Sequence, residues 1–93
     1  MKFAWSEAKA QSNAIKHSVT FEEATQVFYD TLSGTLDDPI HSDEEERFIT
    51  IGMTFTNRLL FVSFIERDDT IRIISARQAT RKERTRYENQ SRI

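Results

Sequence analysis

Residues 71–88 read IRIISARQATRKERTRYE, and this stretch decides the fold because an apolar strand runs directly into a helix rich in arginine. Steps of four and three residues lead from Arg77 to Arg81 and Arg84, a spacing that places side chains on one helical face. Like charges spaced in this way repel one another in an isolated helix, so the pattern lacks an obvious folding reason. An anionic ligand would explain it, and we therefore predict an anion-binding site where the strand meets the helix.

Charge is distributed unevenly along the chain. The formal net charge is −2, yet residues 71–93 carry seven Lys or Arg against two Glu. The excess is cancelled by residues 37–46, which hold six carboxylates and no Lys or Arg. An anionic partner responds to the local field of a patch, within a Debye length of ~8 Å at physiological salt. The composition is therefore compatible with a nucleic-acid partner at the basic end, although both segments can equally be solvated faces.

The length of 93 residues predicts one domain that spans the whole sequence. Cysteine is absent, which excludes disulfides, thiolate zinc sites and thiol nucleophiles. No apolar run is long enough for a signal peptide or a membrane span, so we expect a cytoplasmic protein. We predict no metal and no cofactor, because the acidic run lacks the ligand spacing and the glycine of a calcium loop.

Capping and periodicity signals predict an α+β domain with an antiparallel sheet, two N-terminal helices and one C-terminal helix. Ser6 suits the N-cap of a first helix that ends near Lys16. Thr20 and Glu23 form a capping box at the start of a second helix, whose apolar face reaches Phe28. The predicted strands are residues 2–5, 31–38, 47–55, 58–66 and 70–77, with turns at residues 56–57 and 67–69.

A set of residues spread over nearly the whole chain carries a family resemblance. The set comprises Phe3-Ala4-Trp5, Lys9, Asn13, Lys16-His17, Val19, Phe21, Glu23-Ala24, Phe28, Asp30, Glu46-Arg47, Ile51-Gly52, Arg72-Ile73-Ile74-Ser75-Ala76-Arg77, Ala79, Glu83-Arg84 and Tyr87-Glu88. In this order it resembles the BrnT toxins of bacterial type II toxin–antitoxin systems. Two positions depart from the family pattern. Ser6 stands where Asp is common, which is harmless at an N-cap, and Ser18 stands where Gly is common, which makes a left-handed C-cap less comfortable.

The resemblance implies a RelE-like ribonuclease fold and a metal-independent endoribonuclease that slows growth by cutting RNA. It also implies a partner antitoxin of the BrnA type with a ribbon-helix-helix part, and a toxin–antitoxin complex that binds and represses its own operator DNA. Without the resemblance, the residues lead only to a small α+β domain with an anion-binding C-terminal end.

Metal-free RNA cleavage needs three steps: the 2′-hydroxyl is deprotonated, the phosphorane charge is stabilised and the 5′-oxygen is protonated. Arginine supplies fixed positive charge for the second step, and histidine titrates near neutrality and can transfer protons. The residues that we predict to be catalytic are Arg77, His17, Tyr87 and Glu46. Those that we predict to bind RNA are Lys16, Arg47, Arg81 and Arg84.

Two of these catalytic residues have plain structural alternatives. Arg77 can form an ordinary surface ion pair with Glu46 or Glu83 instead of binding a phosphate. Tyr87 is the lone aromatic of a mostly polar helix, so its ring can close the core.

The remaining candidates have alternatives as well. Lys16 and His17 end the first predicted helix, where cations interact favourably with the helix dipole. Glu46 and Arg47 begin a strand with their side chains on opposite faces, so only one can face a site, and charge there can simply protect an exposed edge.

A second function is also open. The basic helix can belong to a non-enzymatic interaction module, or to an inactive toxin relic, that binds an antitoxin and operator DNA as a co-repressor. Growth arrest on expression of the chain alone separates an enzyme from such a module.

Overall fold

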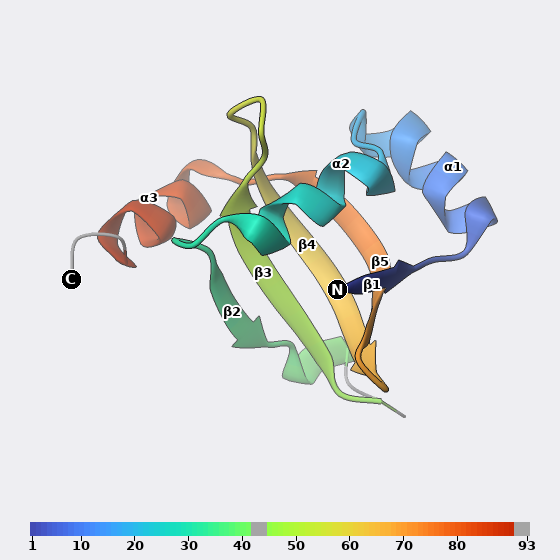
Figure 1. Ribbon diagram of the computed structural model, residues 1–93. Coiled ribbons are helices and arrows are strands. Elements are labelled where there is room, and N and C mark those ends of the chain that lie inside the picture. Colours follow the sequence, from blue (N-terminus) through green and yellow to red (C-terminus); the bar gives the residue numbers. More distant parts are fainter. Residues whose placement is uncertain (42–44, 91–93) are drawn as a thin grey trace.

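The computed structural model describes residues 1–41 and 45–90, which build a five-stranded sheet with helices at both ends of the molecule (Figure 1). The strand order is β1-β5-β4-β3-β2. The elements follow one another as β1 (Lys2–Ala4), α1 (Glu7–His17), α2 (Phe21–Thr25), the 3₁₀ helix η1 (Gln26–Tyr29), β2 (Gly34–Asp37), the 3₁₀ helix η2 (Pro39–His41), β3 (Arg47–Met53), β4 (Leu59–Arg67), β5 (Thr70–Gln78) and α3 (Arg81–Gln90).

The predicted α+β class is confirmed, and the sheet is antiparallel except at one edge. Strands β2 to β5 pair antiparallel with their neighbours, whereas β1 runs parallel to β5 with Phe3 opposite Ile71. A parallel pair needs a long connection, and the chain between β1 and β5 provides it. The predicted antiparallel sheet is thus confirmed for β2 to β5, and only the edge strand β1 departs from it.

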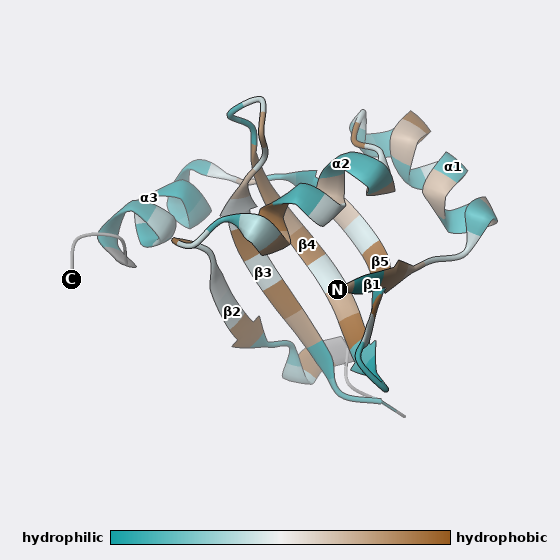
Figure 2. Cartoon of the chain, in the orientation of Figure 1, coloured by the Kyte–Doolittle hydropathy of each residue, from teal (hydrophilic) through white to brown (hydrophobic). Residues whose placement is uncertain are grey.

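The main core lies between the sheet and the two N-terminal helices. Leu60 and Val62 of β4 and Ile73 of β5 are fully buried on this sheet face, against Phe21 and Val27 of the α2–η1 segment. The nearly continuous apolar run of β4 suits a strand covered on both faces. Figure 2 shows the contrast between the hydrophobic central strands and the largely hydrophilic α3.

A smaller core lies on the opposite sheet face, beneath α3. Ile51 and Leu59 are buried there with Tyr87, and Met53 and Phe61 are partly buried beside them. Tyr87 is therefore the side chain by which the polar helix α3 is anchored to the sheet.

The helix termini show which sequence signals were realised. The Ser6 hydroxyl accepts the Lys9 N–H, and the Thr20 hydroxyl accepts the Glu23 N–H, so both predicted N-caps are confirmed. Ser18 ends α1 in the left-handed region at φ 57°, the conformation that glycine adopts more easily. The second helix is shorter than its apolar pattern suggested, because a 3₁₀ helix replaces the α-helix from Gln26 onward.

The β3–β4 hairpin corrects one further prediction. The strand predicted for residues 47–55 ends already at Met53, and Phe55 lies in the turn with 71% of its surface exposed. Thr54 is buried in its place, and its hydroxyl accepts the N–H of Arg58 at 3.0 Å. Residues 42–44 of the predicted acidic loop lie outside the described residues.

The outer edge of β5 is closed by a side chain. Beyond its short pairing with β1, the edge backbone at Ala76 donates its N–H to Asn13 Oδ1 at 3.1 Å, and its carbonyl accepts from Asn13 Nδ2 at 2.8 Å. The same Nδ2 also donates to the carbonyl of Val19 at 3.0 Å. Buried Asn13 thus replaces a neighbouring strand and fixes α1 beside the edge.

Candidate functional site

Arg77 stands near the end of β5, opposite Phe61 of β4. Its guanidinium forms two parallel hydrogen bonds with Glu83, Nη1 to Oε1 at 2.8 Å and Nη2 to Oε2 at 3.0 Å. The guanidinium carbon also lies 4.0 Å from the centroid of the Phe61 ring, a cation–π contact. The paired carboxylate and the aromatic ring hold the arginine in one orientation, with 35% of its side chain still exposed.

Glu83 has a second partner, the first turn of α3. Its Oε1 accepts the N–H of Thr80 at 2.9 Å, and the Thr80 hydroxyl accepts the N–H of Glu83 at 3.2 Å, which is a capping box. The hydrogen bonds from Arg77 lower the pKa of Glu83 most, burial opposes them, and the bonds from Thr80 add to the decrease. One carboxylate therefore starts the helix and orients Arg77.

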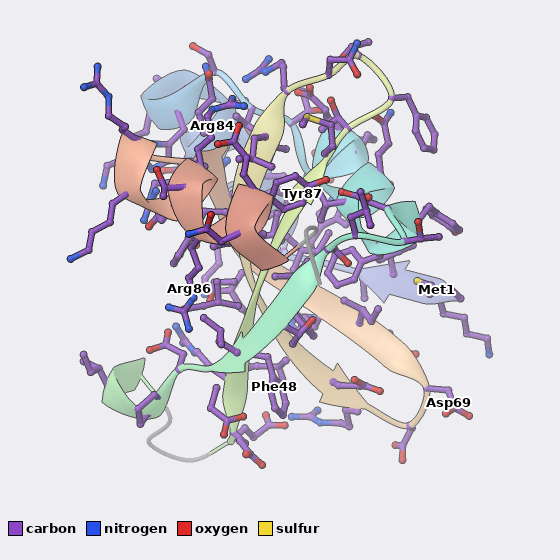
Figure 3. The ribbon with its side chains drawn as sticks, turned by 90° about the vertical axis from the view of Figure 1, so that its left-hand side faces the viewer. Met1, Phe48, Asp69, Arg84, Arg86 and Tyr87 are labelled. Carbon is purple, nitrogen blue, oxygen red and sulfur yellow. The ribbon has the colours of Figure 1, made fainter. Side chains whose placement is uncertain are left out.

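The predicted stacking of three arginines on one helix was wrong for Arg77. That residue belongs to β5, which continues to Gln78, and α3 begins only at Arg81. Arg81 and Arg84 remain exposed on the first turn of α3. Arg84 and Arg86 emerge on opposite sides of this helix (Figure 3).

Tyr87 is 7% exposed, and its hydroxyl donates to Asp30 Oδ2 at 2.6 Å. Asp30 also accepts the N–H of Met53 at 2.8 Å and that of Leu32 at 2.9 Å. Burial, then the hydrogen bond and the charge of Asp30, raise the pKa of Tyr87 to about 12. These contacts match the structural alternative for Tyr87, in which the ring closes the core.

The pKa of Asp30 responds to the same contacts in the other direction. Burial alone would raise it, but the hydrogen bonds from Tyr87, Met53 and Leu32 together lower it. Asp30 is therefore held as a carboxylate that ties α3 to the body of the protein.

A basic cavity of about 250 Å³ lies between α1 and the edge of β5. Lys9, Lys16 and His17 contribute positive or titratable groups, and no carboxylate lines the cavity. The lysines are exposed, whereas His17 is half-buried. The remaining lining residues are Ser12, Asn13, Ile74 and Ser75. An anion in this cavity would meet ammonium, imidazole and hydroxyl groups together.

A β-bulge interrupts the regular pairing of β5 beside this cavity. The register between β4 and β5 shifts at Ser63 and Phe64, whose partners are Ser75 and Ile73, so Ile74 is the additional residue. Bulges of this kind redirect side chains beside functional sites. Here Ser75 reaches the cavity and stands two residues before Arg77 on the same strand.

Glu46 and Arg47 lie far from both groups. Arg47 pairs with Ile65, whereas Arg77 pairs with Phe61, so the two arginines are four residues, or ~13 Å, apart along β4. The structure thus places Arg77 with Arg81 and Arg84 at one junction, and Lys16 with His17 in the adjacent cavity. It leaves Glu46 and Arg47 at the other end of the sheet.

The sequence did not identify Lys9, Ser12 or Ser75 as lining residues of the cavity. Lys9, Asn13 and Lys16 recur at steps of four and three, which puts them on one face of α1, and this spacing was the available signal. Within residues 1–41 and 45–90, no group of three His, Cys, Asp or Glu side chains is arranged to hold a metal ion.

The fold and these positive groups define a small α+β protein with a cluster of basic side chains at one edge of its sheet. A family model described as the ribonuclease toxin BrnT of type II toxin–antitoxin systems matches residues 5–83. The chain therefore belongs to the BrnT family of ribonuclease toxins, and the resemblance inferred from the sequence is confirmed.

One solved structure extends the comparison to the fold. The 1.1 Å crystal structure of the Brucella abortus ribonuclease toxin BrnT is similar to this chain with a TM-score of 0.68 and 23% sequence identity. The match covers 87% of this chain and 99% of that chain. No curated protein sequence matches the chain. None of the helices in the described part of the chain is long and apolar enough to cross a membrane.

Proposed function

We propose that this BrnT-family toxin is a metal-independent endoribonuclease whose reaction takes place where the β5–α3 junction meets the α1 cavity. The observation that carries the proposal is the cavity itself, which brings His17 together with two lysines beside the strand that holds Arg77. These groups supply both requirements of metal-free RNA cleavage, proton transfer and fixed positive charge. A toxin that cuts cellular RNA acts in the cytoplasm.

In this mechanism each group has a separate task. His17 takes the proton of the 2′-hydroxyl or returns one to the leaving 5′-oxygen, the usual task of a histidine in general acid–base catalysis. Arg77, already oriented by Glu83, stabilises the charge that develops on the phosphorane. Lys16 holds an RNA phosphate at the cavity, and Arg81 and Arg84 hold the backbone as it passes α3. These arginines and lysines are exposed enough to be reached by RNA.

The other predicted roles find less support in the geometry. Tyr87 is committed to Asp30, and the raised pKa of its hydroxyl makes it a poor base at neutral pH. Glu46 and Arg47 stand at the opposite end of β3 from α3 and can contact only a distant part of a bound RNA. The catalytic roles of Tyr87 and Glu46 and the RNA contact of Arg47 stay predictions.

A BrnA-type antitoxin is the partner that we propose for the uncovered half of the α3-side sheet face. Ile49 and Phe61 are only partly buried there, although they belong to an apolar cluster. A partner that covers this face would bury on the order of 1,600 Å² in a stable complex and would block Arg77 at the same time. Operator DNA would then be bound through the ribbon-helix-helix part of the antitoxin.

The test of the enzymatic proposal is RNA cleavage by the purified protein in EDTA. We expect products that end in a 2′,3′-cyclic phosphate or a 3′-phosphate. Arg77→Ala should lower the rate by ~10², and His17→Ala should lower it by ~10²–10⁴ because a proton-transfer group is lost. Lys82→Ala, at an exposed position of α3, is the charge-matched control. A requirement for Mg²⁺ with 3′-hydroxyl products would refute the mechanism.

One observation favours the non-enzymatic alternative. In the free protein the hydrogen bonds of Arg77 are directed to Glu83 and to the carbonyl of Gln78, so an RNA phosphate must compete with them. If the chain is a relic that only binds an antitoxin and DNA, its expression alone will not arrest growth. Arg77→Ala would then leave repression by the complex unchanged.

A further inference from the structure

A second cavity, of about 220 Å³, lies at the other end of β5 from Arg77. It opens beside the β4–β5 turn, where β1 adds the edge of the sheet. Its lining residues are Ala4, Ile65, Arg67, Asp68, Thr70 and Arg72. None of these residues lines the α1 cavity.

The β-bulge at Ile74 places this cavity on the same sheet face as Arg77. Arg72 and Arg77 are five residues apart, and strict alternation would direct them to opposite faces. The additional residue changes the alternation, because Arg72 pairs with Ile65 and Arg77 with Phe61, two β4 residues of the same face. A single strand of RNA lying on this face can therefore meet both arginines, which are ~16 Å apart along β5.

The charges around the cavity nearly cancel, which favours a neutral planar group over a phosphate. The guanidinium of Arg67 is paired with Glu45, and the carboxylate of Asp68 is the one negative charge among the lining residues, beside the positive charge of Arg72. Arg72 is exposed, and no hydrogen bond or ion pair within the described residues engages it. A guanidinium without a partner stacks well on a nucleobase.

The remaining lining groups complete a site for a base. Ala4 and Ile65 offer an apolar surface, and Asp68 and Thr70 offer hydrogen-bonding oxygens. Ligand sites commonly combine an apolar wall with a few polar groups in this way. The acceptor is a carboxylate, so it pairs with a base edge that presents N–H donors.

Asp68 lies in the β4–β5 turn, and the residues of this turn are not those that usually stabilise a hairpin. Asp68 and Asp69 both adopt left-handed conformations, at φ 50° and φ 63°, where Asn-Gly or Asp-Gly is the usual pair. Two adjacent carboxylates also repel each other. Asp69 points away from the sheet at the tip of the turn (Figure 3), whereas Asp68 lines the cavity.

We propose that this cavity binds a nucleobase of the RNA whose scissile phosphate lies at Arg77, and that Asp68 selects guanine there. The N1–H and N2–H of guanine are parallel donors that match the two oxygens of a carboxylate. Arg72 stacks on the ring, and the site sets the sequence preference at a fixed distance from the cut. The inference rests on the proposed ribonuclease function.

Binding of RNA that cannot be cut tests the base preference apart from catalysis. The probes are 2′-O-methyl RNA octamers, one of uridine alone and one with a single central guanosine, measured by fluorescence anisotropy. We expect the protein to bind the guanosine octamer about tenfold more tightly. Replacement of that guanine by hypoxanthine, which lacks the N2 amino group, should remove most of the difference.

Two variants test whether Asp68 and Arg72 are responsible for the guanine preference. Asp68→Asn keeps a side chain that tolerates the left-handed turn but presents an N–H to a guanine N–H, so both octamers should bind alike. Arg72→Ala should weaken binding of both octamers, and Lys82→Ala should keep the parental ratio. Melting curves check that each variant is folded.

The outcomes separate this inference from the proposed function. Equal affinity of the parent protein for both octamers, or a guanine preference that survives Asp68→Asn, overturns the assignment of the cavity. A guanine preference in a protein that never cuts ordinary RNA supports the cavity and refutes the ribonuclease mechanism. Cleavage of ordinary RNA without a base preference supports the ribonuclease mechanism and refutes the assignment of the cavity.

Discussion

At the scale of single residues, Asp30 shows how a buried carboxylate can be assigned to structure rather than to chemistry. Its oxygens accept hydrogen bonds from Tyr87, Met53 and Leu32, so its acceptor sites are directed at the protein. Tyr87 in turn has its hydroxyl fixed at 2.6 Å from Asp30. A carboxylate–phenol pair of this kind fastens one helix to one strand end, and neither group faces the basic cavity of α1.

The substitution Tyr87→Phe tests that assignment. It keeps the ring in its apolar cluster and removes only the hydroxyl, so we expect the free energy of unfolding to fall by about 1–2 kcal/mol. Urea unfolding measures this change. RNA cleavage below the melting temperature should continue at the parental rate. A large loss of cleavage in a folded Tyr87→Phe protein would instead support the catalytic role predicted from the sequence.

Gly52 illustrates a steric requirement at a single position. A Cβ added there would lie 3.0 Å from Val27 Cβ and from the Val27 carbonyl, and 3.1 Å from Ser33 Cβ. Strand β3 therefore packs its backbone directly against η1. Gly52→Ala should lower the free energy of unfolding by about 1–3 kcal/mol through overpacking, measured by urea unfolding. A variant as stable as the parent would show that η1 shifts freely.

At the scale of elements, the buried side chain of α1, Asn13, ties this helix to the edge of the sheet. Asn13 supplies three hydrogen bonds to backbone groups, two of them at Ala76 on the β5 edge. It thereby closes an edge that would otherwise present unpaired backbone groups. The same contact holds Lys16 and His17 beside Ser75, because all four residues line one cavity.

Asn13→Ala should therefore cost more than an ordinary surface change. Buried backbone groups at Val19 and Ala76 lose their partners, and we expect a loss of about 3 kcal/mol in the free energy of unfolding. Ser12→Ala, an exposed neighbour on the same helix, should change stability by less than ~0.5 kcal/mol. Hydrogen exchange at Ala76 gives a local readout, since its N–H donates to Asn13. Unchanged exchange at Ala76 would contradict this role.

At the scale of the whole molecule, local patterns predicted most elements but not how they meet. The apolar run of β4 and the capping box at Thr20 are local signals, and both were realised. The bulge at Ile74 and the contact of Asn13 with Ala76, 63 residues away, leave no local pattern. For the same reason the sequence indicated Lys16 and His17 as candidate site residues but not the cavity that they line.

The site shows the same division between local and long-range information. Glu83 was foreseen, together with Glu46, as one possible partner of Arg77, and it lies only six residues away in the chain. The cation–π contact with Phe61 depends on strand register, which the sequence does not specify by itself. The parallel pairing of β1 depends on the path of the whole chain and was not foreseen.

As the pH falls, α3 should lose stability before the rest of the molecule. The reason is that two carboxylates that hold this helix in place have lowered pKa values. These are Asp30, with an ordinary pKa of 3.8, and Glu83, with an ordinary pKa of 4.5. Between the folded and the unfolded pKa, the unfolded chain binds more protons, so stability rises with pH there. The contribution of both groups is therefore present in full above about pH 5 and is lost as the pH falls through their folded pKa values.

Urea unfolding between pH 7 and pH 3 measures this loss, and hydrogen exchange locates it. We expect the unfolding midpoint to fall below about pH 4.5, with α3 amides losing protection before those of β4. Glu83→Gln should reduce stability at pH 7 and make the acid side of the profile shallower, because one of the two titrating groups is gone. Glu22→Gln, an exposed residue on α2, should leave the slope unchanged. If the Glu83→Gln protein shows the parental slope, the Arg77–Glu83 pair does not couple α3 to pH.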